Sequence, residues 1–259
     1  MWTRLELKTR AKKILSENYW KAFLVSLIIV LVGGGDGGGS SSSGTNYTVS
    51  NSQFDLEKVL LIGSIIFLGV ILFIALRIFI GYGLEVGSRK FFIRASEGES
   101  NLNHVKFVFK SGHVGNVIVA MLYRSILLFL WLLCLIIPGV IKSYAYRFVP
   151  YLLADNPDLS PSKAIELSNK MTNGHKMDMF ILDLSFIGWY ILGGLALGVG
   201  ILFVNPYRDT TYSELYLVLR DNLIKSGVCS ANELNLVTTS DSKDIESDKW
   251  ESVFDRYDD

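Results

Sequence analysis

The sequence has few of the residues that cross-link small secreted domains or bind transition metals. Its 259 residues include only two cysteines and three histidines. Cys134 lies in an apolar run and Cys229 lies near the acidic C-terminal part, so we expect free thiols and neither a disulfide framework nor a zinc cluster. We therefore predict no cofactor and no metal, with His175 and Asp178 as weak candidates for a metal site.

Short catalytic motifs are also lacking. There is no HExxH pair, no G-x-S-x-G elbow and no paired-carboxylate signature in suitable surroundings. The glycine-rich stretch GGGDGGG has neither the lysine nor the strand that a phosphate-binding loop needs. These absences argue against an enzyme. An intramembrane hydrolase that uses His175, Asp178 and Asp183 stays open as the weakest of three functional hypotheses.

The chain has no excess of charge of either sign, since its formal net charge is +0. We therefore expect no nucleic-acid partner. The distribution of charge is more informative than the total: residues 1–21 carry six Lys/Arg against two Glu, whereas residues 226–259 carry nine Asp/Glu against three Lys/Arg. The basic start has a long charged lead with acids, and no small-x-small cleavage site follows the first apolar run. This pattern predicts an amphipathic cytoplasmic helix that leads into a retained membrane helix.

Long apolar runs dominate the rest of the sequence. Half of the residues are hydrophobic and the mean hydropathy is +0.34. A helix that crosses a bilayer needs about 20 mostly apolar residues. The pattern predicts an all-α protein, a polytopic transmembrane helical bundle of about six spans with short amphipathic cytoplasmic helices. The expected spans are 19–32, 59–82, 117–137, 139–154, 179–204 and, if the fifth run folds back, 201–219.

Proline and glycine mark the expected boundaries. Pro138-Gly139 should break the third apolar run, because proline has no N–H and glycine tolerates a turn. Ser160 is a suitable N-cap with Pro161 at the first helical position, and Asn173-Gly174 is a suitable stop. Residues 179–204 form either one span or two helices that turn near Gly198–Gly200, and we favour the turn.

The lysine and arginine bias sets the expected orientation. The N-terminus and the 85–115 loop are basic, so we place both in the cytoplasm of a bacterial cell, with the protein in the cell membrane as a multi-pass protein. We expect a transmembrane domain over 1–225, which includes an extracytoplasmic Gly/Ser-rich loop at 33–55. Residues 226–259 should form an acidic, disordered tail.

Ionisable side chains inside the apolar runs are the candidates for function. A charge in the middle of a membrane costs about 2.5–3.5 kcal/mol on insertion scales, so each one needs a partner or water. We expect Asp183 to face inward and to pair with Arg124 or Arg147, or else to be protonated. The arrangement fits a packing ion pair or a pathway for a solute, lipid headgroup or proton. The intramembrane candidates are Arg77, Arg124, Arg147, Asp183, Arg208 and Asp209, with Lys142 also in an apolar run.

Three stretches carry a resemblance to a known family. They are RLELKTRAKKILSENYWKAFLVSLI, the long block from LLCLIIPGVIKSYAYRFVPYLLADNPDLSPSKAIELSNKMTNG to GWYIL, and GVGILFVNPYRDTTYSELYLVL. They resemble the bacterial integral membrane proteins of the domain of unknown function 975 family. A looser similarity links them to the membrane domain of some glycerophosphodiester phosphodiesterases. The resemblance implies a bundle of about six spans in a plasma membrane and no established activity. We expect no phosphodiesterase catalytic domain in this sequence, so that enzyme function does not carry over.

Our first functional hypothesis is a non-enzymatic membrane protein that binds or helps to move a small or lipid-like ligand, or accompanies a transporter. The second is a membrane scaffold or regulator that recruits a soluble partner through its acidic tail. The expected partners are the lipid bilayer, a transporter or another membrane protein, and a second copy of the chain.

Overall fold

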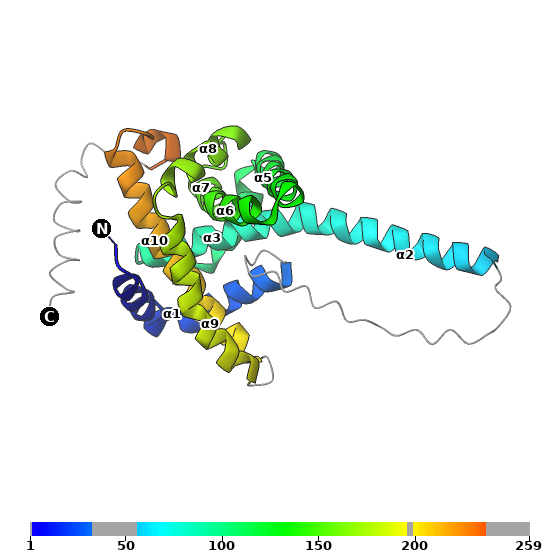
Figure 1. Cartoon of the computed structure of the whole chain (residues 1–259), viewed down its shortest axis with the longest axis horizontal. Coiled ribbons are helices and arrows are strands. Elements are labelled where there is room, and N and C mark those ends of the chain that lie inside the picture. The colour runs from blue at the N-terminus through cyan, green and yellow to red at the C-terminus, as the bar shows by residue number, and fades with distance from the viewer. Residues whose placement is uncertain (1, 33–55, 196–198, 237–259) are drawn as a thin grey trace.

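The computed structural model describes residues 2–32, 56–195 and 199–236, and every regular element in these ranges is a helix (Figure 1). The Gly/Ser loop predicted at 33–55, Gly198, and residues 237–259 of the tail predicted at 226–259 lie outside the described residues. The helices are α1 (Arg4–Val32), α2 (Leu56–Leu76), the π-helix η1 (Arg77–Gly81), α3 (Tyr82–Ser96), the 3-10 helix η2 (Leu102–Lys106), α4 (Phe107–Ser111), α5 (Val114–Cys134), α6 (Ile136–Ala145), α7 (Val149–Asp155), α8 (Pro161–Met171), α9 (Lys176–Leu195), α10 (Val199–Lys225) and the 3-10 helix η3 (Ala231–Leu234).

Three helices in the described part of the chain are long and apolar enough to cross a membrane. They cover Leu60–Ser96, Val114–Cys134 and Lys176–Leu195. The all-α class is therefore confirmed, whereas six spans stay a prediction. Helix α1 consists of two parts that meet at a kink at Asn18, whose φ of −129° and ψ of 24° are not helical. The kink lies where the charged lead passes into the apolar run predicted at 19–32.

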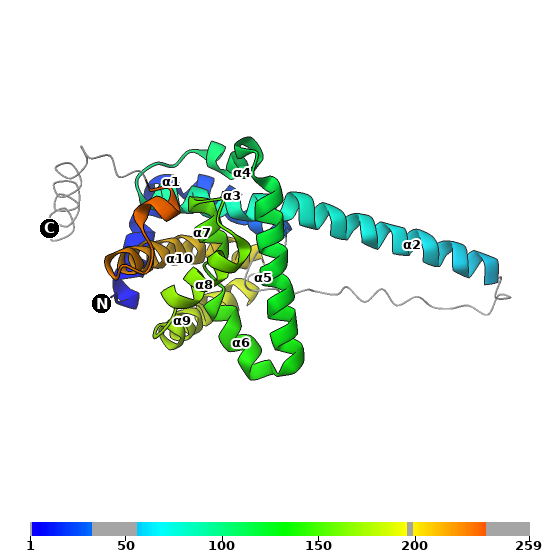
Figure 2. The ribbon, with the colours of Figure 1, turned by 90° about the horizontal axis from the view of Figure 1, so that it is seen from above.

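Helix α2 extends away from the other helices (Figures 1 and 2). Its side chains from residue 60 to 73 are all exposed, and they include Ile66 at 60% and Phe73 at 71% exposure. A helix that is apolar on every side and that packs on no other helix matches a lipid environment. Helices α5 and α6 form a hairpin that leaves the core in another direction, and the α9–α10 pair leaves it in a third (Figures 1 and 2).

The region 85–115 was predicted as a basic loop, and that prediction is wrong. Helix α3 continues directly from α2 and η1, and it is buried from Glu85 to Ile93. The charged residues do not end the helix because its apolar side chains, among them Val86 and Phe91, pack in the protein core. Gly87 lets α3 approach the segment at η2, since a Cβ at this position would lie 2.0 Å from the carbonyl oxygen of Val105.

The break predicted at Pro138-Gly139 falls slightly earlier. Helix α5 ends at Cys134, and Leu135 is extended with φ −161° and ψ 140°. Pro138 then lies in the first turn of α6, where its missing N–H leaves no hydrogen bond unmade. Gly139 packs against the backbone of Leu132, so the two helices of the hairpin are in close contact.

The single span predicted at 139–154 is also wrong, because this segment forms the two short helices α6 and α7. Pro150 stands in the first turn of α7 and cannot donate to the carbonyl four residues earlier, which belongs to Tyr146. The chain turns at Tyr146, and the Arg124 side chain donates to the Tyr146 carbonyl at 2.9 Å. The guanidinium and the Val149 N–H, at 3.4 Å, therefore supply the hydrogen bonds to this carbonyl that Pro150 cannot make.

Two other predicted boundaries are close to the observed ones. Helix α8 begins at Pro161 after Ser160, and the chain beyond Met171 reaches Gly174, whose φ is +82°. The run 179–204 is divided into α9 and α10, as we favoured. The two helices cross closely where Gly193 faces Gly200, since a Cβ on Gly193 would lie 2.8 Å from the Gly200 carbonyl carbon.

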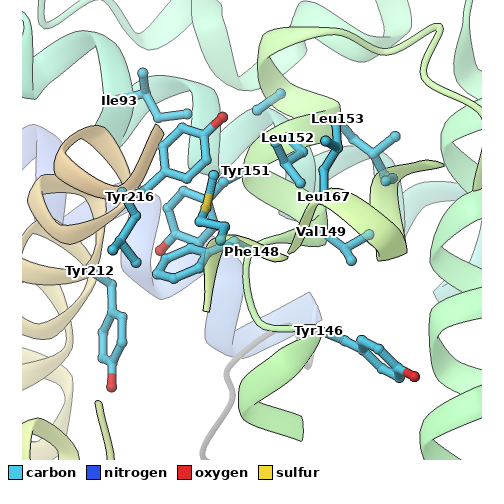
Figure 3. Packing of buried hydrophobic residues seen from close by; sticks show 14 of the residues in the cluster. Ile93, Tyr146, Phe148, Val149, Tyr151, Leu152, Leu153, Leu167, Tyr212 and Tyr216 are labelled. Atoms are coloured by element: carbon cyan, nitrogen blue, oxygen red, sulfur yellow. The ribbon is translucent and has the colours of Figure 1, made fainter. Parts of the chain in front are cut away.

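The core lies where α3, α7, α8 and α10 meet. Figure 3 shows Phe148, Tyr151 and Tyr216 packed together. The ring centroids of Tyr151 and Tyr216 are 5.2 Å apart, and each lies within 6 Å of the Phe148 ring, at 5.5 Å and 5.8 Å. Such aromatic groups supply much apolar area while their hydroxyls reach polar partners.

The contact at Gly87 makes a first testable prediction. Gly87→Ala should lower the free energy of unfolding by about 1–3 kcal/mol, because the added methyl group meets backbone atoms that cannot rotate away. Gly188→Ala in α9 is the matched control, since a Cβ there meets no atom within 4 Å. Unfolding in detergent, followed by circular dichroism, measures both; equal stability of the two variants would contradict the prediction.

Candidate functional site

Charged and tyrosine side chains recur every fourth residue on two segments of the core. Residues 147–155 carry Arg147, Tyr151 and Asp155, and α10 carries such residues at 208, 212, 216 and 220. A spacing of four places side chains on one helical face. These faces meet each other and α3, so that several ion pairs lie inside the protein.

The first ion pair is centred on Asp183 of α9. Its Oδ2 lies 2.7 Å from Nη1 of Arg147 and accepts a hydrogen bond from the Tyr144 hydroxyl at 3.0 Å. Its Oδ1 accepts from the Tyr212 hydroxyl at 2.6 Å and lies 3.6 Å from Nε of Arg208. Asp183 is therefore inward-facing and paired, as expected. The carboxylate joins α9 to α10 and to the α6–α7 turn.

A second pair is centred on Asp155 at the end of α7. Oδ2 accepts from Nη1 of Arg220 at 2.9 Å and from the Tyr216 hydroxyl at 2.7 Å, while Oδ1 lies 3.4 Å from Nζ of Lys90. Arg220 also reaches Glu97 at 3.0 Å. Burial by itself would lower the pKa of the Arg220 guanidinium, but Asp155, Tyr216 and Glu97 raise it above its ordinary value. Arg220 thus stays charged.

A third pair joins α3 to α10 and α1. Nη1 of Arg89 lies 3.0 Å from Oδ1 of Asp209 and donates to the Tyr151 hydroxyl at 3.2 Å. The Ser26 hydroxyl donates to Oδ2 of Asp209 at 2.7 Å. Asp209 is 6% exposed and Arg89 is 3% exposed, so the pair is removed from water.

We expected Asp183 to pair with either Arg124 or Arg147, and the structure pairs it with Arg147. Arg124 lies 3.7 Å from Oε1 of Glu85 in α3, and Arg147 rather than Arg124 pairs with Asp183. Arg77 begins η1, with its guanidinium 5.3 Å from the Tyr82 ring centre, and it takes no part in these clusters.

Lys142 and the metal candidates also lie apart from the ion pairs. Nζ of Lys142 stands 5.0 Å from the Trp131 ring centre. Nδ1 of His175 lies 3.7 Å from Asp178, and the His175 ring is 6.1 Å from that of Trp2. Within the described ranges, no group of three or more His, Cys, Asp and Glu could hold a metal ion.

Sequence reasoning missed most of the buried polar residues, and Arg124, Arg147 and Asp209 are the buried ones that it named. Glu85, Arg89 and Lys90 were assigned to a loop, and Asp155 and Arg220 to segment ends. The spacing of four in Arg147, Tyr151 and Asp155, and its repetition in α10, was the available signal. The missed residues that the structure brings into the clusters are Ser26, Glu85, Arg89, Lys90, Glu97, Asp155 and Arg220.

A groove lies outside these clusters, between α1, α9 and α10. Its volume is about 460 Å³. One side is apolar and includes Trp189, which is 51% exposed, and Phe203, which is 45% exposed. The lining residues are Lys12, Leu15, Ser16, Tyr19, Trp189, Phe203, Val204 and Tyr207. The groove was not predicted, because its walls come from segments far apart in the sequence.

Comparison with known families gives one match. A family profile described as "Protein of unknown function (DUF975)" matches residues 105–223. This match supports the resemblance over the segment that contains Asp155, Asp183 and Asp209. Helix α1 and the charged part of α3 lie before the matched segment. Searches of curated proteins and of solved structures gave no match.

The ion pair at Asp183 makes the second prediction. Asp183→Asn should lower the free energy of unfolding by about 3 kcal/mol, because it leaves the charges of Arg147 and Arg208 without their carboxylate. Glu166→Gln in α8 is the control, since Glu166 pairs with Lys170 on the surface, where both side chains are 48% exposed. Urea or detergent-induced unfolding measures the difference. An Asp183→Asn protein as stable as the control would show that the pair does not hold the helices together.

Proposed function

We propose that this protein is a non-enzymatic, multi-pass protein of a bacterial cell membrane that binds a lipid-like ligand. The groove between α1, α9 and α10 carries the proposal. Its volume of about 460 Å³ falls in the range of small-molecule sites, which are mostly apolar with a few polar groups. Here Leu15, Phe203 and Val204 supply apolar surface, and Lys12, Ser16 and Tyr19 supply polar atoms on the α1 side.

The position of the groove supports a ligand from the bilayer. One wall is α9, which is a candidate membrane span. Beyond Trp189 the same helix exposes Ile191 at 59% and Leu192 at 61%. An amphiphile in the surrounding lipid can therefore reach the groove along an apolar surface, without passing through water.

The ion pairs next to the groove support a structural role, in which they hold the helices together, rather than a catalytic role. Asp183, Asp155 and Asp209 each face a basic side chain and a hydroxyl group. Each carboxylate therefore joins side chains from different helices, which is what a structural ion pair does. Accompanying a transporter is compatible with the same site, with the groove offering a lipid to a neighbouring membrane protein. The scaffold alternative depends on a tail that lies mostly outside the described residues.

Lipid binding can be measured with Trp189 as the reporter. In a variant that keeps Trp189 as its only tryptophan, a brominated phospholipid titrated into the detergent-purified protein should quench fluorescence with saturation. Val204→Phe should raise the half-saturation concentration about tenfold, because the larger ring fills the groove. Val119→Phe is the control, since Val119 lies on α5 and is 55% exposed.

Two results of this titration would count against the proposed function. Quenching that rises in proportion to lipid without saturation would show only bulk contact with the micelle. Equal affinities of the Val204→Phe and Val119→Phe variants would show that the bound lipid lies elsewhere. Retained helical content by circular dichroism confirms that each variant folds; if Val204→Phe does not, Phe203→Ala tests the same wall by removing apolar contact.

The proposed orientation rests on which polar segments lie together. The Trp2 ring is near the His175 ring at 6.1 Å, and Lys163 in α8 lies 3.7 Å from Glu233 in η3. The N-terminus is therefore a neighbour of the α8–α9 connection, and η3 is a neighbour of the first turn of α8. Leu135 follows the C-terminal end of α5. This helix has 21 residues, so Leu135 lies about 30 Å from the end at which α5 begins.

Cysteine labelling in intact cells tests this orientation. In a background without Cys134 and Cys229, we expect Ile136→Cys to react with a membrane-impermeant maleimide from outside. Asn173→Cys should react only after the cells are permeabilised, because it lies on the cytoplasmic side with the N-terminus. The reverse pattern would show that the N-terminus is extracytoplasmic.

A further inference from the structure

The N-terminal half of α1 has three distinct faces. Leu7, Ala11 and Leu15 are buried and pack against the protein. A second face carries Glu6 and Arg10, which form an ion pair with 2.6 Å between Oε1 of Glu6 and Nη2 of Arg10. A third face remains, and its residues are spaced by four along the helix, which brings them into one row.

Arg4, Lys8 and Lys12 form this third face, which we call the basic row. In the described part of the chain none of the three forms an ion pair. Lys8 donates to the backbone carbonyl of Ser185 at 3.4 Å, and its ammonium group stands 4.3 Å from the Phe186 ring centre. Partial burial lowers the pKa of Lys8, and the charges of Arg4 and Lys12 lower it further. The basic row is therefore a concentration of positive charge with which no acidic side chain of the described residues forms an ion pair.

The basic row runs directly into the groove. Lys12 is both its last residue and a lining residue, and its Nζ lies 5.9 Å from the ring centre of Tyr207 in the same groove. We infer that the ligand of the groove is a membrane-resident amphiphile with an anionic phosphate-type headgroup. The headgroup lies on Arg4, Lys8 and Lys12, and an apolar chain lies against Trp189, Phe203 and Val204. This inference rests on the proposed function, because it assigns the headgroup of the ligand proposed there.

The charge of the basic row and the apolar wall of the groove both fit an amphiphile with an anionic headgroup. An anionic headgroup gains attraction from each nearby lysine or arginine, and phosphate oxygens accept hydrogen bonds from both side-chain types. The apolar wall favours a ligand with a hydrocarbon chain over a free anion. A free phosphate ion would gain the charge interaction but would leave the exposed rings of Trp189 and Phe203 uncovered.

Competition between two phospholipids tests the headgroup. The Trp189 reporter protein is titrated with brominated lipid and then challenged with phosphatidylglycerol or with phosphatidylcholine of identical chains. We expect phosphatidylglycerol to displace the reporter lipid at a concentration at least tenfold lower. Lys12→Gln should weaken phosphatidylglycerol about fivefold and leave phosphatidylcholine unchanged, since one lysine contributes about that factor near an anionic headgroup.

Lys13→Gln is the matched control for Lys12→Gln. It removes the same charge from the next residue, which the helix turns away from the basic row. A loss of affinity in both variants alike would show a general effect of net charge and overturn the inference. Equal competition by the two lipids would also overturn it while leaving the proposed function intact, because chain binding would persist without headgroup selection.

Inorganic phosphate distinguishes the lipid from a free anion. At millimolar concentration and constant ionic strength, phosphate should not displace the brominated lipid, because it lacks the chain that the apolar wall binds. Displacement by phosphate that is abolished in Lys12→Gln would assign the basic row to a soluble anion and overturn the lipid assignment. The absence of any saturable quenching, in contrast, would remove the proposed function itself.

Discussion

A carboxylate buried between helices must regain from the protein the hydrogen bonds and positive charge that water no longer provides, and this requirement determines how the core helices meet. Asp155 and Asp209, which are buried, and Asp183, whose side chain is 22% exposed, each satisfy it with an arginine and at least one hydroxyl group. The partners come from different helices, so a displacement of α3 or of α10 would separate several pairs at once. Apolar packing alone would restrict such movements less strictly.

Pro150 shows how the need of polar groups for hydrogen-bond partners also shapes the backbone. Pro150 has no N–H, so a continuous helix from α6 into α7 would leave the Tyr146 carbonyl without its backbone hydrogen-bond donor. The chain turns there instead, and the Tyr146 carbonyl accepts from Nε of Arg124 at 2.9 Å and from the Val149 N–H at 3.4 Å, while Arg124 also faces Glu85. The turn directs Arg147 toward Asp183. Pro150 therefore accounts for the division of the predicted span into α6 and α7.

Hydrophobic runs and cap residues were sufficient to predict an all-α protein, the start of α8 and the inward position of Asp183. They failed at residues 85–96, because charge density was taken as evidence for a loop, whereas Glu85, Arg89 and Lys90 meet partners from α5, α7 and α10. The groove was beyond sequence reasoning for a related cause: its walls meet only through tertiary packing. Local patterns report which face of a helix is polar, and they do not report what that face meets.

The groove and the Asp183 cluster depend on one another through α9 and α10. Phe186 lies three residues after Asp183, and its ring is 5.3 Å from the ring of Tyr207, which lines the groove and precedes Arg208. The side chains that fix the two helices by charge are thus adjacent to those that form the groove wall. Because Lys8 also covers Phe186, the basic row is positioned by the same contact. The ion pair at Asp183 and the groove wall therefore lie on the same stretch of α9 and α10, although Asp183 does not line the groove.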